Sequence, residues 1–159
     1  MFAREREVIQ SALAALKASV EHIGSTSVPG LPAKPKIDIL VGLQSWDDLD
    51  PAVDVLLQAG YEHEAQLLVL RHFSVKRGHP TTHRVHLVEH DSDQWTQLLT
   101  FRDALRADPE LAARYGELKQ ELARFHPDDH QAYSEGKGAF IERVLRGDSM
   151  NVHDAHDQR

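Results

Sequence analysis

The sequence contains no cysteine among its 159 residues. This absence excludes a disulfide framework, a thiolate zinc site and a cysteine nucleophile. The chain also lacks any hydrophobic run of membrane-spanning length, and its first ten residues, MFAREREVIQ, are too highly charged for a signal peptide. We therefore expect a cytoplasmic protein with no membrane partner.

Positive charge is scarce as well. The chain has 18 Lys and Arg residues against 25 Asp and Glu, which gives a formal net charge of −7. Because a surface of this sign repels phosphate backbones, we expect no bulk nucleic-acid binding. Any anion site must be local. Residues 101–146, with eight basic and nine acidic side chains, are better placed for anion contacts than residues 47–64, where acids occur without Lys or Arg.

The length suits one domain with a substantial core. Hydrophobic spacing predicts a sheet of short strands interleaved with helices and followed by a helical region. The expected helices are 3–18, 47–61, 91–107, 108–125 and 128–146, and the expected strands are 20–23, 35–43, 66–78 and 82–90. This order predicts an α/β or α+β fold with a small mixed sheet and a C-terminal helical bundle. We place the domain at 1–147 and expect 148–159 to be a polar, flexible tail.

One stretch, HIGSTSVPGLPAKPKID at residues 22–38, carries most of the functional signal. Gly24 follows the first strand, and the hydroxyls of Ser25, Thr26 and Ser27 come directly after it. Free backbone amides and hydroxyls at such a turn favour an anion pocket, since Gly24 lets a phosphate approach the backbone. Turns of this composition are also common on protein surfaces, so a solvated turn is the alternative.

Asp38 lies between Ile37 and Ile39 in an apolar strand, where an unpaired carboxylate is costly to bury. It either binds a cation at the open end of the strand or forms a salt bridge with a nearby base. The residues alone leave both alternatives open. The candidate bases are Lys34, Lys36, Arg71 and Arg84.

Basic side chains of the later strands and the last helix could complement a phosphate. Arg71 and Arg84 lie on the later strands, while Tyr133 and Lys137 are four residues apart on one helix face. The alternative role for the arginines is neutralisation of Asp38 or of helix acids.

Eleven histidines form no zinc signature, and we expect no zinc. His83 and His86 lie three apart, which suits metal ligands on a helix and not on a strand. An imidazole can accept a proton near neutral pH, so His86 is a candidate proton acceptor.

The run VEHIGSTSVPGLPAKPKIDILVGL resembles the signature of the GrpB family, also designated UPF0157, which is described as a dephospho-CoA kinase/protein-folding accessory domain. The similarity continues through THRVHLVEH to Tyr133 and Lys137 of AYSEGKGAFI, and it covers nearly the whole chain except the tail. The resemblance implies a nucleotidyltransferase-like fold.

Nucleotidyltransferases hold nucleotide phosphate on a Gly-Ser turn and bind Mg²⁺ with two acids one residue apart on the next strand. Gly24, Ser25 and Asp38 match these elements, but Leu40 replaces the second acid, and Glu89 is the nearest later acid. Strand alternation places Glu89 and His86 on opposite faces.

Two functions follow from the resemblance. The first is a Mg²⁺-dependent nucleotidyltransferase acting on a nucleotide or phosphorylated small molecule, with Asp38 holding the metal and His86 accepting a proton. The second is a noncatalytic folding-accessory or partner-binding module related to dephospho-CoA kinase. Leu40 favours the second, because a two-metal mechanism is difficult with one carboxylate.

Overall fold

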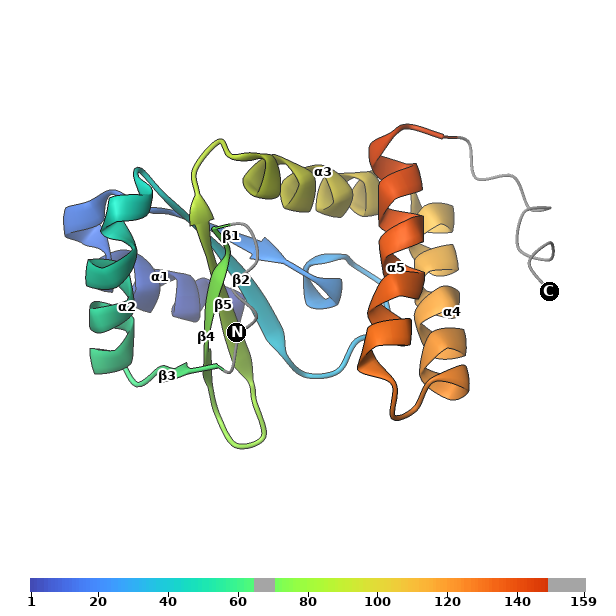
Figure 1. Ribbon diagram of the computed structural model, residues 1–159, viewed down its shortest axis with the longest axis horizontal. Helices are drawn as coiled ribbons and strands as arrows, with labels where there is room; N and C mark the ends of the chain where they lie inside the picture. Colours follow the sequence, from blue (N-terminus) through green and yellow to red (C-terminus); the bar gives the residue numbers. More distant parts are fainter. Residues whose placement is uncertain (65–70, 149–159) are drawn as a thin grey trace. The chain divides into compact units, whose positions relative to one another are not determined.

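The computed structural model describes residues 1–64 and 71–148, and its secondary structure is shown in Figure 1. The chain forms two compact units. The first contains residues 1–27 and 32–99, and the second contains residues 28–31 and the described residues from 100 onward. The last eleven residues of the predicted tail lie outside the described residues, so its flexibility stays a prediction.

The first unit is built on a mixed sheet, as predicted, but the sheet has five strands and not the four that the sequence pattern indicated. Its order is β1-β2-β5-β4-β3, with β2 and β5 parallel and the other neighbours antiparallel. The strands are β1 (Ser19–Ile23), β2 (Ile37–Leu43), β3 (Glu62–His63), β4 (Phe73–Arg77) and β5 (His83–Glu89). The predicted central strand is confirmed, because β2 lies between β1 and β5. Residues 65–70 of the predicted strand 66–78 lie outside the described residues.

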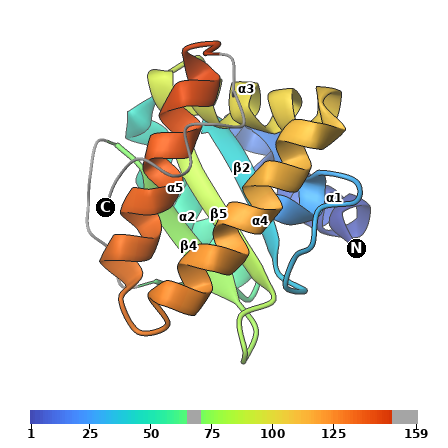
Figure 2. The same cartoon turned by 90° about the vertical axis from the view of Figure 1, so that its right-hand side faces the viewer.

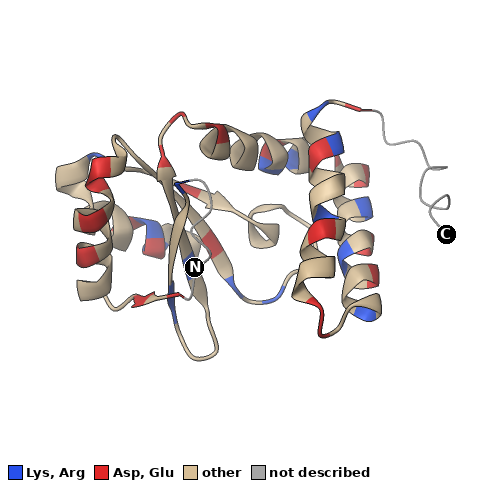
Figure 3. Ribbon diagram, viewed as in Figure 1, with Lys and Arg blue, Asp and Glu red and all other residues tan. Residues whose placement is uncertain are grey.

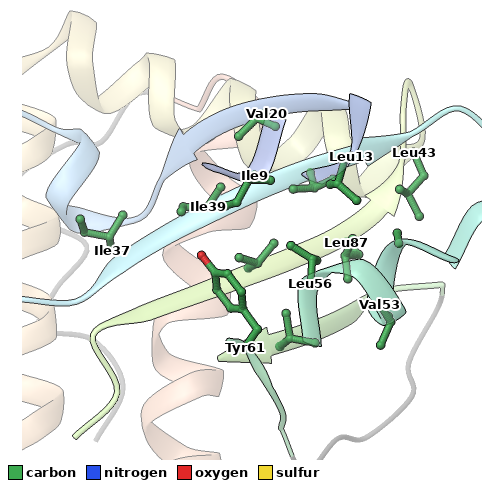
Figure 4. Packing of buried hydrophobic residues seen from close by; sticks show 14 residues of the cluster. Ile9, Leu13, Val20, Ile37, Ile39, Leu43, Val53, Leu56, Tyr61 and Leu87 are labelled. Atoms are coloured by element: carbon green, nitrogen blue, oxygen red, sulfur yellow. The ribbon is translucent and has the colours of Figure 1, made fainter. Parts of the chain in front are cut away.

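One face of this sheet is covered by α1 (Phe2–Ala12) and α2 (Leu49–Gln58), and it contains the main core. Figure 4 shows Ile9 and Leu56 of these helices packing with Ile39 of β2 and Leu87 of β5, all four fully buried. Burial of aliphatic side chains is the dominant favourable contribution to folding.

The predicted helix over 3–18 is too long at its C-terminal end. The α-helix ends at Ala12, and a short 3₁₀ turn, η1 (Ala14–Leu16), follows before Lys17 adopts a left-handed conformation with φ of 51°. The apolar spacing continues past Ala12, which explains the overextension, because a 3₁₀ turn keeps similar side-chain spacing.

The opposite face of the sheet carries both apolar and polar side chains. Because alternate strand residues share a face, Asp38 and Leu40 of β2 project on this side, as do their register partners Arg84 and His86 of β5. Leu40 is covered by the first part of α3 (Asp93–Ala107), where it packs in a buried cluster with Ile23, Val88 and Trp95. The polar members of this face form the site described below.

The second unit contains the later part of α3 together with α4 (Pro109–Phe125) and α5 (His130–Leu145), as predicted for the C-terminal helices. Figure 2 shows α4 and α5 side by side. Their N-terminal ends are capped by Asp108 and Asp129, whose side chains accept hydrogen bonds from backbone N–H groups. Leu105, Tyr115 and Phe140 form part of the core of this unit.

Charge is unevenly distributed over the first unit. Figure 3 shows acidic residues along α2, whereas Lys34 and Lys36 occupy the segment that leads into β2. Within residues 1–64 and 71–148, no helix has the length and apolar content needed to cross a membrane.

Candidate functional site

The Gly-Ser turn and Asp38 lie next to each other, as the alignment of their strands requires. Ile23, the last residue of β1, pairs with Asp38, so Gly24 follows directly beside that carboxylate. A Cβ atom built on Gly24 would lie 2.9 Å from Asp38 Oδ2, and the φ of Gly24 is +74°. Only glycine combines this backbone conformation with so close an approach.

The turn itself is stabilised by its own hydroxyls. It forms a short 3₁₀ segment, η2 (Ser25–Ser27), in which the Ser27 hydroxyl donates to the Gly24 carbonyl over 2.6 Å. The Thr26 hydroxyl lies 2.9 Å from His22 Nε2. Ser27 is buried and Ser25 is half-buried. The structure therefore gives Ser27 and Thr26 a role in holding the turn, in addition to the phosphate contacts predicted for them.

Asp38 is held by a histidine rather than by any of the four predicted bases. Its Oδ1 lies 3.3 Å from His86 Nε2, and the other ring nitrogen of His86, Nδ1, lies 3.0 Å from His72 Nε2. About a fifth of each of the Asp38 and His86 side chains is exposed. Asp38, His86 and His72 thus form a hydrogen-bonded chain across β2, β5 and the residue that precedes β4.

The surroundings of Asp38 are electropositive despite the acidic composition of the chain. Burial by itself would raise the pKa of Asp38, but the hydrogen bond with His86 and the positive charges of Lys36 and Arg84 together hold that pKa below its ordinary value. Asp38 is consequently ionised at neutral pH. The same positive charges favour a bound anion.

Arg84 forms its closest ion pair with Glu64. Its Nε and Nη2 atoms donate to Glu64 Oε1 over 3.1 and 2.5 Å, and the Ser74 hydroxyl donates to Glu64 Oε2 over 3.0 Å. Burial would raise the pKa of Glu64, but these bonds and the charge of Arg84 lower it. Arg84 therefore contributes charge near Asp38 without bonding to it.

Other predicted site residues lie apart from Asp38 in the first unit. Glu89 aligns with Leu43 at the far end of β2, where it accepts hydrogen bonds from Arg71 over 3.4 Å and from the Trp46 backbone over 3.0 Å. The idea that Glu89 supplies a third acid beside Asp38 is therefore wrong, because β2 and β5 are parallel and these two acids occupy opposite ends. Arg71, which forms an ion pair with Glu89, therefore also lies away from Asp38.

The remaining residues predicted to bind phosphate are Lys34, Tyr133 and Lys137. Lys34 is exposed in the segment before β2. Tyr133 and Lys137 belong to the second unit, where the Lys137 ammonium lies 4.4 Å from the centre of the Tyr133 ring. Their contribution to a phosphate site stays a prediction.

The residues present do not fit a two-acid magnesium site. Leu40, at the second acid position, has no exposed surface and packs with Ile23, Val88 and Trp95. In the described part of the chain, no group of three His, Asp or Glu side chains is arranged to hold a metal ion. Asp38 could therefore contribute a single carboxylate to a cation held mainly by a ligand.

Three members of this polar face were not anticipated from the sequence, namely Glu64, His72 and Ser74. His72 and Ser74 are two apart in a segment expected to be a strand, and their spacing is the one signal that places them on a common face. Their proximity to Asp38 depends on the register of β4 against β5, which pairs Ser74 with His86. Local sequence does not specify that register.

Comparison with known proteins gives consistent results. A family model described as GrpB protein matches residues 1–147. The chain is 32% identical to the Glutamate-rich protein GrpB of Alkalihalophilus pseudofirmus, covering 91% of this chain and 87% of the relative. It is 42% identical to a UPF0157 protein of Pseudomonas aeruginosa, again over 91% of this chain but over only 61% of that longer relative.

Solved structures support the same grouping. The crystal structure of conserved protein GrpB from Enterococcus faecalis has a TM-score of 0.73 and 32% identity, with 91% of this chain and 92% of that chain covered. Terminal uridylyl transferase 4 from Trypanosoma brucei with bound GTP has a TM-score of 0.56 at 16% identity, covering 91% of this chain and 52% of that chain. This second likeness shows that the fold is nucleotidyltransferase-like.

Part of a larger enzyme is also similar to this chain. The chain is 32% identical to the dephospho-CoA kinase of Mycolicibacterium paratuberculosis, with 80% of this chain and 38% of that enzyme covered. The match of the family model over nearly the full described length, together with relatives and a crystal structure at 32% identity or above, places this chain in the GrpB family.

Proposed function

We propose that this protein binds a nucleotide or another phosphorylated small molecule at the turn formed by Gly24 and Ser25, beside Asp38. The close approach of Gly24 to the Asp38 carboxylate carries this proposal, because it brings an exposed glycine backbone and an ionised acid to one point. The phosphate would contact the turn, and Asp38 would accept a hydrogen bond from a ligand hydroxyl.

The local charge supports an anionic ligand. Lys36 and Arg84 both lower the pKa of Asp38, so their positive charges act at the same place. This cluster offsets the repulsion that a chain of net charge −7 would otherwise exert on phosphate. The nucleotidyltransferase-like fold is consistent with such a ligand but does not identify it.

We propose no Mg²⁺-dependent nucleotidyl transfer, because a buried leucine occupies the position of the second acid. Asp38 and the ligand phosphates together could still engage the ion, which makes Mg²⁺ an experimental variable. We expect ligand affinity to be the same in Mg²⁺ and in EDTA. A Mg²⁺-dependent gain that Asp38→Asn abolishes would restore a metal role for Asp38.

Calorimetry with ATP, GTP, CTP and UTP tests the binding proposal. Lys36→Gln should weaken binding about 2- to 10-fold, the effect of losing an interaction of about 0.5–1.5 kcal/mol. Lys17→Gln is the matched control, since it removes the same charge from an exposed position that follows η1. Absence of binding by all four nucleotides and by pyrophosphate would refute the proposal, as would equal effects of the two lysine variants.

A second candidate is a noncatalytic module that binds a protein partner. Buried Leu40 favours it, because the position is part of the packing beneath α3 and adds no ligand to Asp38. The similarity to 38% of a dephospho-CoA kinase suggests the kinase portion of such an enzyme as the partner. Titration of that purified portion with this chain tests the idea, with micromolar binding or an improved refolding yield expected. Lack of both would exclude this partner.

A further inference from the structure

Both ring nitrogens of His86 form hydrogen bonds within the polar face of the sheet. Nε2 lies 3.3 Å from Asp38 Oδ1, and Nδ1 lies 3.0 Å from His72 Nε2. The second oxygen of Asp38, Oδ2, is the atom that a Cβ on Gly24 would meet. The Asp38 carboxylate is therefore held between His86 on one side and the Gly-Ser turn on the other.

Hydrogen-bonding rules fix the protons in this chain when Asp38 is ionised and His86 is neutral. An ionised carboxylate only accepts, so His86 Nε2 must carry the proton that lies between it and Asp38. A neutral imidazole protonated on Nε2 has a bare Nδ1, which can only accept. The proton between the two histidines must then come from Nε2 of His72, which donates to His86.

We propose that His72 is a positioning residue of the site beside Gly24: by donating to Nδ1 of His86, it fixes the orientation of the His86 ring, which in turn holds the Asp38 carboxylate toward the Gly-Ser turn. The effect on ligand affinity rests on the function proposed above, whereas the hydrogen bond between the two rings does not. In this arrangement His86 orients Asp38 and has neither ring nitrogen available to a substrate, in contrast to the proton acceptor suggested by its residue type.

The environment of His72 suits a neutral donor. Burial lowers the pKa of His72 to about 4. The two rings meet edge to face, with centroids 5.2 Å apart and planes at 65°. The charged groups that act on this chain from neighbouring segments are Lys36, Glu64 and Arg84, and Arg84 is itself paired with Glu64.

The proton positions can be measured without any ligand. Long-range ¹H–¹⁵N spectra of the full chain at pH 7.5 distinguish an imidazole protonated on Nε2 from one protonated on Nδ1, and His86→Gln identifies the His86 signals. We expect His86 to be protonated on Nε2 in the wild type and in His72→Gln, because the glutamine amide also donates. In His72→Phe we expect the proton to stay on Nε2, because the Asp38 carboxylate still accepts it, and the Nδ1 signal to move to that of a nitrogen without a hydrogen bond. His79→Phe, at a position whose side chain is 76% exposed, controls for loss of a histidine.

Inorganic pyrophosphate serves as the probe of affinity. His72→Phe should bind it about 3- to 10-fold more weakly, as expected for a lost hydrogen bond, and His72→Gln should recover most of the affinity. His86 protonated on Nδ1 in the wild type, or a His72→Phe spectrum identical to the wild type, would overturn the inference. If the protons behave as expected but the wild type binds no pyrophosphate, the positioning role is supported and the phosphate-binding proposal fails.

Discussion

Replacement of Gly24 by alanine tests the geometry on which the site depends. The left-handed backbone of Gly24 costs a non-glycine residue about 1–2 kcal/mol, partly offset by about 0.4–1 kcal/mol from a stiffer unfolded chain. The new methyl group would also lie 2.9 Å from Asp38 Oδ2 and 3.1 Å from Asp38 Cβ. Displacing this side chain weakens its bond to His86, an effect of about 1.5–3 kcal/mol for a charged group.

Gly30 offers a matched control. Its φ is +79°, close to that of Gly24, but nothing lies within 4 Å of an added Cβ. Gly30→Ala therefore carries the same backbone cost without the collision. We expect Gly24→Ala to lower the free energy of unfolding by about 2–4 kcal/mol and Gly30→Ala by about 1 kcal/mol. At about 2–4 °C per kcal/mol, the melting temperatures should differ by roughly 5 °C.

Urea denaturation of both variants measures these free energies, and calorimetry with pyrophosphate measures the site. A double-mutant cycle with Asp38→Ala isolates the collision with the carboxylate, because that change removes the oxygen that the methyl group meets and keeps the Cβ atom at 3.1 Å. The penalty of Gly24→Ala should then fall toward that of Gly30→Ala. Equal penalties for the two glycine variants, or a Gly24→Ala protein that binds pyrophosphate normally, would refute the proposed close approach and its functional importance.

Three further predictions concern buried groups. Leu40→Asp should destabilise the fold by about 3–5 kcal/mol, because it buries an unpaired charge, and a melting temperature restored by Mg²⁺ with ATP would contradict this. The pKa of His72 is about 4 in the folded protein, below its ordinary 6.5, so its contribution to stability is present above pH 6.5 and lost as the pH falls toward 4. In urea denaturation between pH 7 and pH 4, the free energy of unfolding should therefore decrease less in His72→Gln than in the wild type. Glu5 is buried and accepts hydrogen bonds from Tyr61 and Arg77, so Glu5→Gln should cost about 2 kcal/mol in urea denaturation, whereas the exposed control Glu7→Gln should cost less than about 0.5 kcal/mol.

The sequence by itself determined the elements that local chemistry specifies. The stretch 37–43 is apolar except for Asp38 and shows almost no alternation, a pattern typical of a strand buried on both faces, which made β2 recognisable as central. Asp108 followed by Pro109 marked the start of α4 because that pair caps a helix and fits its first turn. The spacing from Gly24 to Asp38, carried by a family-like motif, was enough to identify the turn and the acid as one candidate site.

Tertiary structure decided which groups surround Asp38. Its partner could be named only once the register of β2 against β5 was known, because that register aligns Arg84 with Asp38 and places His86 next to it. Arg84 pairs with Glu64, and His86 lies within hydrogen-bonding distance of Asp38. The pairing of β4 with β5 likewise recruited His72, a residue with no local signal of function. Because β2 and β5 are parallel, Glu89 lies at the end of the sheet opposite to Asp38. Leu40 is buried because Trp95 of α3 packs against it. These outcomes depend on contacts between segments far apart in the chain, and side-chain periodicity within one segment does not encode them.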